Sequence, residues 1–161
     1  MTTYLKEDFL YDADLVLEDS LDSDGVAAAI EASAAGSVLG DPQVIDLGDG
    51  LVEGYMIVDI DAIDVTTGED QLYTIKLQGN NAAAFTAALV VDLAHLQLGC
   101  GTLLVNATAG TDIGAAGNRF VVPFRNEQNG TVYRYVRAYQ LIADASSGES
   151  ITDTIWLSIK R

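Results

Sequence analysis

The chain has 161 residues, 49% of them hydrophobic, which fits one globular domain with a substantial core. Its formal net charge is −16, from 24 acidic and 8 basic side chains. An acidic surface repels phosphate backbones and anionic lipid, so this composition argues against nucleic-acid and membrane partners. The apolar residues fall in short runs, none approaching the ~20 residues of a membrane-spanning helix.

The charge is concentrated in one half of the chain. Residues 1–70 carry 18 acids and one base, a net charge of −17, whereas residues 71–161 carry 6 acids and 7 bases, a net charge of +1. The acidic half either keeps a concentrated protein dispersed or favours a basic protein partner. The N-terminus lacks the basic and apolar regions of a secretory signal peptide. The single cysteine, Cys100, cannot form an internal disulfide, so we expect a fold independent of oxidation.

Strand patterns begin after residue 50. In 55–62, apolar side chains alternate with acids from Met56 onward, which predicts a strand with Met56, Val58, Ile60 and Ala62 toward the core. A polar turn cluster at 66–70 separates it from a second alternating run, 72–78. The next stretch is ambiguous. Its alanines at 82–88 favour a helix, whereas the apolar residues from Leu89 favour a strand.

The C-terminal third continues this pattern. Residues 119–124 alternate, and Pro123 indicates a sheet edge, because proline cannot donate to a ladder. Asn129-Gly130 predicts a hairpin turn, followed by a long strand over 131–142 and a last strand over 151–160. At least six strands at roughly ten-residue spacing predict an all-β fold, an antiparallel two-sheet jelly-roll-like sandwich.

We expect a single domain over 1–161. Within it, residues 1–17 form a possible N-terminal arm, and residues 18–42 an acidic, alanine-rich insertion.

One segment resembles a calcium loop. Asp22, Asp24, Gly25 and Glu31 match the third, fifth, sixth and twelfth positions of an EF-hand loop, but Ser20 stands where the first aspartate belongs. We therefore interpret 20–31 as an exposed acidic loop and predict neither a metal site nor a cofactor.

Other candidate sites are weak. Asp59 and Asp61 lie two apart on one strand face, which is typical of a solvated strand. Cys100 and His95 lie in an apolar stretch. No nucleophile, base and orienting group occur together, so we expect a binding or structural protein and not an enzyme.

The segment from Tyr133 to Tyr139 is the main candidate for an interface. Tyrosine and arginine are enriched at protein interfaces. Strand periodicity places Val132, Val136 and Ala138 on one face, and either face suits the core. The residues of the candidate interface face are Tyr133, Tyr135, Arg137 and Tyr139.

Three segments together resemble the small capsid cement, or decoration, proteins of tailed bacteriophages. They are Asp8–Asp14, Val44–Gly48 and Tyr135–Ala138. The chain departs from that family in its longer acidic, alanine-rich segment between Leu17 and Gln43.

The resemblance implies a jelly-roll structural protein of the virion, without catalytic residues. Such a protein binds the outer surface of the phage head and clamps neighbouring subunits of the major capsid protein. It self-associates as a homo-oligomer, with a dimer favoured, and is present in the host cytoplasm before assembly. The alternative is a carbohydrate-binding or calcium-dependent adhesion module built on a β-sandwich.

Overall fold

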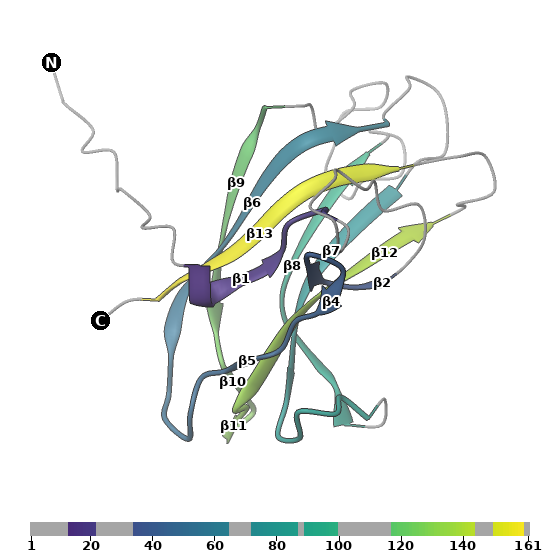
Figure 1. The fold of residues 1–161 in the computed structure, drawn as a ribbon. Helices are drawn as coiled ribbons and strands as arrows, with labels where there is room; N and C mark the ends of the chain where they lie inside the picture. Colours follow the sequence, from purple (N-terminus) through teal and green to yellow (C-terminus); the bar gives the residue numbers. More distant parts are fainter. Residues whose placement is uncertain are drawn as a thin grey trace, which may run out of the picture.

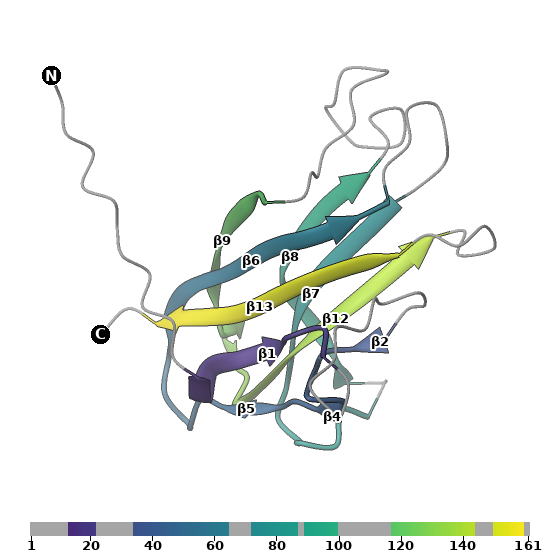
Figure 2. The same cartoon turned by 45° about the horizontal axis from the view of Figure 1, so that its top comes forward.

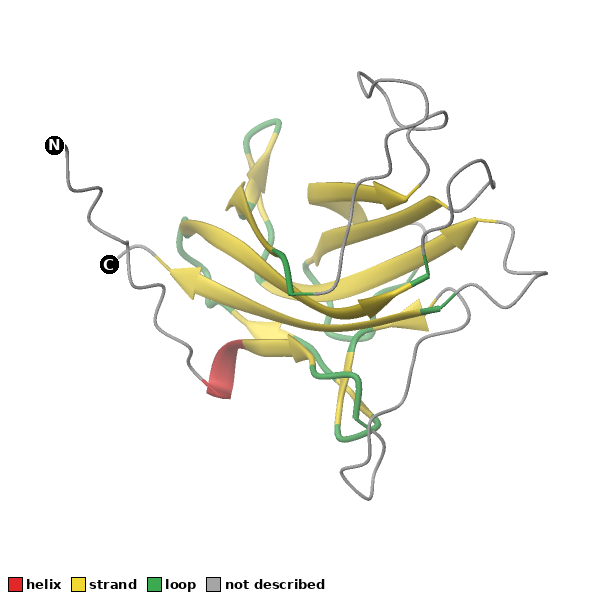
Figure 3. Cartoon of the chain, turned by 90° about the horizontal axis from the view of Figure 1, so that it is seen from above, coloured by secondary structure: helices red, strands yellow, loops and turns green. Residues whose placement is uncertain are grey.

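The fold is nearly all strand. In the computed structural model, the residues described are 13–21, 34–64, 72–86, 89–99, 117–143 and 150–159. The helical element among them is η1, a short 3-10 turn over Ala13–Leu15 that leads into the first strand (Figure 3). The predicted all-β class is confirmed.

The strands form two main antiparallel sheets, which appear as two layers in Figures 1 and 2. The first sheet has the order β1 (Val16–Glu18), β13 (Ile151–Ile159), β6 (Glu53–Ile63), β9 (Arg119–Arg125). The second has the order β2 (Ala34–Ala35), β12 (Tyr135–Ala143), β7 (Leu72–Asn80), β8 (Val91–Gly99), with β5 (Ile45–Asp46) also paired to β12.

Two short hairpins complete the described strands. One joins β3 (Ser37–Val38) to β4 (Asp41–Pro42). The other joins β10 (Glu127–Gln128) to β11 (Thr131–Val132). Its turn residues, Asn129 and Gly130, have φ angles of 53° and 81°, which confirms the predicted turn.

The order of pairing is that of a jelly roll. β1 pairs with β13, β2 and β5 pair with β12, β6 pairs with β9, and β7 pairs with β8. The chain therefore forms one long antiparallel ribbon. The ribbon is rolled up so that β13 also pairs with β6, and β12 with β7. This is the double-sheet arrangement expected from the strand spacing.

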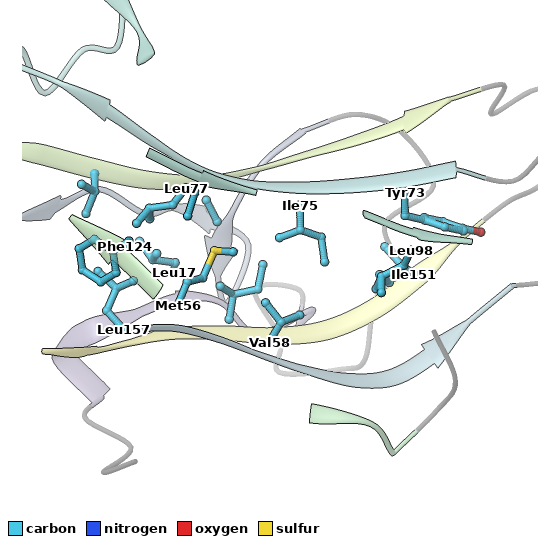
Figure 4. Close-up of a cluster of buried hydrophobic side chains, with 14 of the residues drawn as sticks. Leu17, Met56, Val58, Tyr73, Ile75, Leu77, Leu98, Phe124, Ile151 and Leu157 are labelled. Carbon is cyan, nitrogen blue, oxygen red and sulfur yellow. The ribbon is translucent and has the colours of Figure 1, made fainter. Parts of the chain in front are cut away.

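The core lies between the two sheets and is filled by inward-pointing side chains of the long strands (Figure 4). β6 contributes Met56 and Val58, and β7 contributes Tyr73, Ile75 and Leu77; all five are at most 1% exposed. Burial on this scale stabilises strongly, since truncating a fully buried leucine to alanine costs ~2–5 kcal/mol.

The outer face of the first sheet carries a second, smaller apolar cluster. Val16, Trp156, Ile57 and Val121 lie opposite one another in register across all four strands. The first three are buried, whereas Val121, on the last strand, is 39% exposed. The guanidinium of Arg119 lies 5.1 Å from the centre of the Trp156 ring, so a cation packs against the aromatic member of this row.

Most of the predicted strands are confirmed. β6 and β7 contain the segments 55–62 and 72–78 in which strands were expected. The prediction that Ala62 faces the core is wrong, because the register with β13 shifts between Ile60 and Ala62 and leaves Ala62 exposed. β9, which contains Pro123, is the outermost strand of its sheet, as the proline indicated.

The predicted strand over 131–142 is wrong in its continuity. Residues 133 and 134 are not in a strand, and they separate β11 from β12. Here the backbone N–H of Tyr133 donates to the carbonyl of Asn126 (2.7 Å) and that of Arg134 to the side chain of Asn81 (3.1 Å). These partners take the place of the ladder hydrogen bonds that a continuous strand would make at residues 133 and 134.

The helix considered at 82–88 is absent from the described part of that segment. The N–H of Ala82 donates instead to the side chain of Asn80 (3.0 Å), and that of Phe85 to the carbonyl of Ala82 (3.2 Å). These bonds form turns, so local side-chain chemistry overrides the helix propensity of alanine.

The arm proposed for residues 1–17 is wrong at its C-terminal end. Val16 and Glu18 pair with β13, and the side chain of Leu17 is fully buried in the core. Residues 15–17 are an apolar run, and removing their side chains from water stabilises the folded chain more than leaving them in an extended arm would.

The insertion proposed for residues 18–42 is also part of the sandwich where it is described. β2 pairs with β12, and Gly36 follows it. A Cβ on Gly36 would lie 2.3 Å from the carbonyl oxygen of Leu17, so only glycine allows this close approach. Residues 22–33 lie outside the described residues.

Candidate interaction surface

The outer face of the second sheet holds three of the four predicted interface residues. In β12, the side chains of Val136 and Ala138 are fully buried in the core. Tyr135, Arg137 and Tyr139 alternate with them, so they lie on the opposite face, where each is half-buried. The tyrosine face is therefore not the core, which answers the question that the sequence left open.

Tyr133 does not belong to this face. It precedes β12, and its Cβ lies 3.0 Å from the position that a Cβ on Gly79 would occupy. Tyr133 instead lines a pocket of about 340 Å³ at the end of the sandwich, together with Asn80, Asn81 and Leu89 among others. The break between β11 and β12 separates it from the other three residues.

The neighbouring strand β7 continues the outer face with polar side chains. Arg137 lies opposite Gln78, and Tyr139 lies opposite Lys76. Next to them is a hollow of about 310 Å³. Its lining residues are Thr74, Lys76, Asp92, His95, Gln97 and Leu141. An aromatic strand beside a polar hollow is a surface able to make both apolar and hydrogen-bonded contacts.

Arg137 is held firmly at the centre of this face. Its guanidinium carbon lies 4.5 Å from the ring centre of Phe85 and 5.4 Å from that of Tyr139. Its Nε donates to the side-chain oxygen of Gln78 (3.0 Å). Burial lowers the pKa of Arg137, because part of the charge is removed from water, and the nearby Tyr139 opposes this shift.

The other described cations all have acidic partners. Lys76 pairs with Asp92 (2.7 Å), and Arg119 with Asp59 (2.6 Å). Arg125 lies 3.4 Å from Glu127. Within the described part of the chain, Arg137 is the one cation with no acidic oxygen within 4 Å.

Arg134 joins two segments that are distant in the sequence. Its guanidinium donates twice to the carboxylate of Asp46, at 2.8 and 2.7 Å, and once to Asp49 at 3.2 Å. The hydrogen bonds from Arg134 lower the pKa of Asp46, because they favour the charged carboxylate. A bidentate pair of this kind fixes β5 against the start of β12.

Sequence reasoning missed a polar cluster buried between the sheets. Asp153 of β13 is 0% exposed, and its Oδ1 accepts a hydrogen bond from Nε2 of Gln140 in β12 (2.7 Å). The hydroxyl oxygen of Ser20 accepts the backbone N–H of Asp153 (2.9 Å). The carboxylate of Glu18 accepts the backbone N–H groups of Ser20 and Ser37.

A signal for this cluster exists in the strand pattern. Asp153 shares the inward parity of Ile151, Ile155 and Leu157, and Gln140 shares that of Ala138. A polar residue at an inward position predicts a buried partner.

The calcium-like loop stays largely untested, because residues 22–33 lie outside the described residues. Ser20, which stands at its first position, is 3% exposed and bound to the backbone of Asp153. No cluster of three or more potential metal-binding side chains occurs among the described residues.

The weaker sequence candidates are not brought together. The carboxylate of Asp59 accepts hydrogen bonds from Nε and Nη2 of Arg119, at 2.6 Å each. His95 is exposed on the outer face of the second sheet, and Cys100 lies outside the described residues.

Comparison of the sequence with models of known protein families found no match, and comparison with curated proteins found none. In the described residues, no helix has the length and apolar character needed to cross a membrane.

Proposed function

We propose that this protein is a structural component of a virion. In this role it is a capsid cement or decoration protein that binds the outer surface of a phage head and clamps neighbouring subunits of the major capsid protein. The observation that carries the proposal is the outer face of β12, where Tyr135, Arg137 and Tyr139 stand on a rigid sheet, away from the core.

The segments that resemble capsid cement proteins support this role by their placement. Val44–Gly48 contains β5, and Tyr135–Ala138 begins β12. The two are adjacent strands, with Asp46 opposite Tyr135 and Ile45 opposite Val136. Two of the three segments that resemble this family therefore lie on adjacent strands of the sheet that carries the proposed binding face, whereas residues 8–12 of the third segment lie outside the described residues.

The proposed binding relies on many weak contacts. A single interface of standard size, ~1,600 Å² in total, need not be tight. A homo-oligomer that grips two or more coat subunits makes the second contact intramolecular, which raises avidity by ~10²–10⁴. The acidic N-terminal half then steers docking toward basic regions of the coat surface.

The experiment is an add-back assay on phage heads stripped of this protein. The double variant Tyr135→Ala/Tyr139→Ala is compared with wild type and with Val121→Ala. Val121 is 39% exposed on the outer face of the opposite sheet, which makes it a matched control. Circular dichroism and size-exclusion chromatography with light scattering establish that each variant is folded and report its oligomeric state.

We expect the double variant to stay folded and to lose head binding or self-association, while Val121→Ala behaves like wild type. If the double variant is folded and binds heads normally, the interface does not include Tyr135 and Tyr139. Failure of wild-type protein to bind stripped heads contradicts the capsid role.

A second candidate is carbohydrate binding, favoured by the pocket of about 340 Å³ beside Tyr133. It combines an aromatic side chain at a loop end with the amides of Asn80 and Asn81. Screening of wild-type protein and Tyr133→Ala on a glycan array tests this role. Carbohydrate binding predicts that the wild type binds a glycan and that Tyr133→Ala does not.

A further inference from the structure

The geometry of Arg137 points to a specific chemistry for the partner. We infer that the outer face of the second sheet receives a carboxylate side chain of the partner protein, which pairs with the guanidinium of Arg137. This inference rests on the proposed function, because it takes the partner to be the capsid surface.

Among the described residues, Arg137 has no counter-charge. Acids outnumber bases by 24 to 8 in this chain. Every other described cation pairs with an acid, whereas Arg137 pairs with none of the described acids, although it is partly withdrawn from water. A charge that is desolvated without a partner is costly, and a partner's carboxylate offsets that cost on binding.

Within the described part of the chain, one edge of the Arg137 guanidinium is open to a partner. Gln78 occupies Nε, and the rings of Phe85 and Tyr139 contact the guanidinium. Among the described residues, no acceptor bonds to either Nη group. These two nitrogens form the edge that binds a carboxylate through two parallel hydrogen bonds.

The side chain of Arg137 is preorganised by its neighbours. Phe85 is 6% exposed and has a φ of 47°, a left-handed conformation that is unfavourable for a bulky side chain. The fold thus maintains strain at the residue whose ring lies over Arg137. Strain of this kind tends to occur where a side chain must be held for binding. An arginine already fixed in one rotamer loses less entropy when a partner docks.

The test combines head binding with a direct probe of Arg137. Arg137→Gln removes the charge, and Arg137→Lys keeps the charge but loses the planar fork. Arg125→Gln is the matched control, because it removes the same charge from β9 in the other sheet. Separately, the Nε–Hε NMR signal of Arg137, assigned by its loss in Arg137→Gln, is followed while wild-type protein is titrated with sodium acetate or with sodium chloride.

We expect Arg137→Gln to weaken head binding by about tenfold or more, as the loss of a charge-assisted pair does, with Arg137→Lys intermediate and Arg125→Gln near wild type. We also expect acetate, but not chloride, to shift the Arg137 signal saturably.

The two proposals fail in different ways. If wild type and Arg137→Gln bind heads equally well, the carboxylate inference is overturned and the capsid role stands. If wild type does not bind heads, the capsid role fails, and the titration alone decides the inference. A saturable response specific to acetate then supports it, and equal responses to the two salts overturn it. If Arg137→Gln does not fold, the signal is assigned by its loss in Arg137→Lys, and the head binding of Arg137→Lys together with the titration gives the same decision.

Discussion

The side chain of Gln140 donates a hydrogen bond of 2.7 Å to the carboxylate of Asp153 and so joins the two sheets through the core. Both residues are at most 2% exposed. The remaining oxygens, Oδ2 of Asp153 and Oε1 of Gln140, have no hydrogen-bond partner among the described residues. Two buried acceptors thus lie on hydrogen-bonded neighbours with no donor between them. A proton on Oδ2 of Asp153 would turn that oxygen into a donor, and Oε1 of Gln140 could then accept it.

The substitution Asp153→Asn is therefore expected to stabilise the protein at about pH 8, because an amide donates where the carboxylate cannot and carries no buried charge. The expected gain in the free energy of unfolding is on the order of 1–3 kcal/mol. Urea unfolding measures it. Asp49→Asn is the control, since the side chain of Asp49 is 88% exposed and its loss changes little. A destabilised Asp153→Asn protein would show that the charge itself is needed.

Wild-type stability is expected to fall as pH rises. The pKa of Asp153 is raised from 3.8 to about 7, mainly by burial and to a smaller extent by the negative charges of Glu18 and Asp61, while hydrogen bonds with Gln140 and Ser20 oppose the shift. Between these two values the native state binds a proton that the unfolded state has released, so the free energy of unfolding decreases through this window and levels off above it. The pKa of Glu18 is also raised, mainly by burial, which adds an effect of the same sign.

Melting temperatures at about pH 5 and about pH 8 test this linkage, with Asp153→Asn as the reference. In Asp153→Asn, the other acidic side chains still repel one another as pH rises, but residue 153 no longer has a carboxyl group that releases a proton. A smaller decrease in the variant than in wild type is expected, and equal decreases would assign the effect to net charge alone.

The sequence allowed prediction of the long strands because their periodicity records which face is buried. In β6, alternation from Met56 to Ile60 identified the inward side chains correctly. Pro123 and Asn129-Gly130 were equally informative, since each restricts the backbone in a way that suits few positions.

The contacts that define the site could not be predicted in the same way. Phe85 reaches Arg137 from a turn 52 positions earlier in the chain, and the local alanines favoured a helix there. The pairing of Gln140 with Asp153 depends on how the two sheets pack. Strand periodicity gives the parity of each residue but not its partner across the core.

Asn126 is expected to be a critical structural residue. Its Oδ1 accepts the N–H of Val52 (2.7 Å), and its Nδ2 donates to the carbonyls of Gly50 and Tyr133 (3.0 Å each). The side chain is 0% exposed, so Asn126→Ala leaves three backbone groups without partners. We expect a loss of ~2–4 kcal/mol in urea unfolding. A loss similar to that of an exposed-surface variant would show that water replaces these bonds.

Folding is expected not to require calcium. Ser20, at the first position of the calcium-like loop, is engaged with the backbone of Asp153, and it lacks the carboxylate that a calcium loop uses there. Thermal unfolding in the presence of calcium or of a chelator should give the same melting temperature. A strong rise with calcium, reversed by the chelator, would contradict this prediction.

Retention on DNA is expected to be negligible, because the net charge of −16 opposes binding to phosphate and the described cations other than Arg137 are paired with acids. Chromatography on immobilised DNA at low salt measures this. Tight retention that is lost as salt increases would contradict it.

The most direct test of the central claim is the copy number of this chain in purified virions. Phage particles from the source that encodes this chain are purified, and quantitative mass spectrometry compares the chain with the major capsid protein. A capsid cement protein is expected at a copy number near that of the coat protein. Absence of the chain from intact particles would contradict the capsid role.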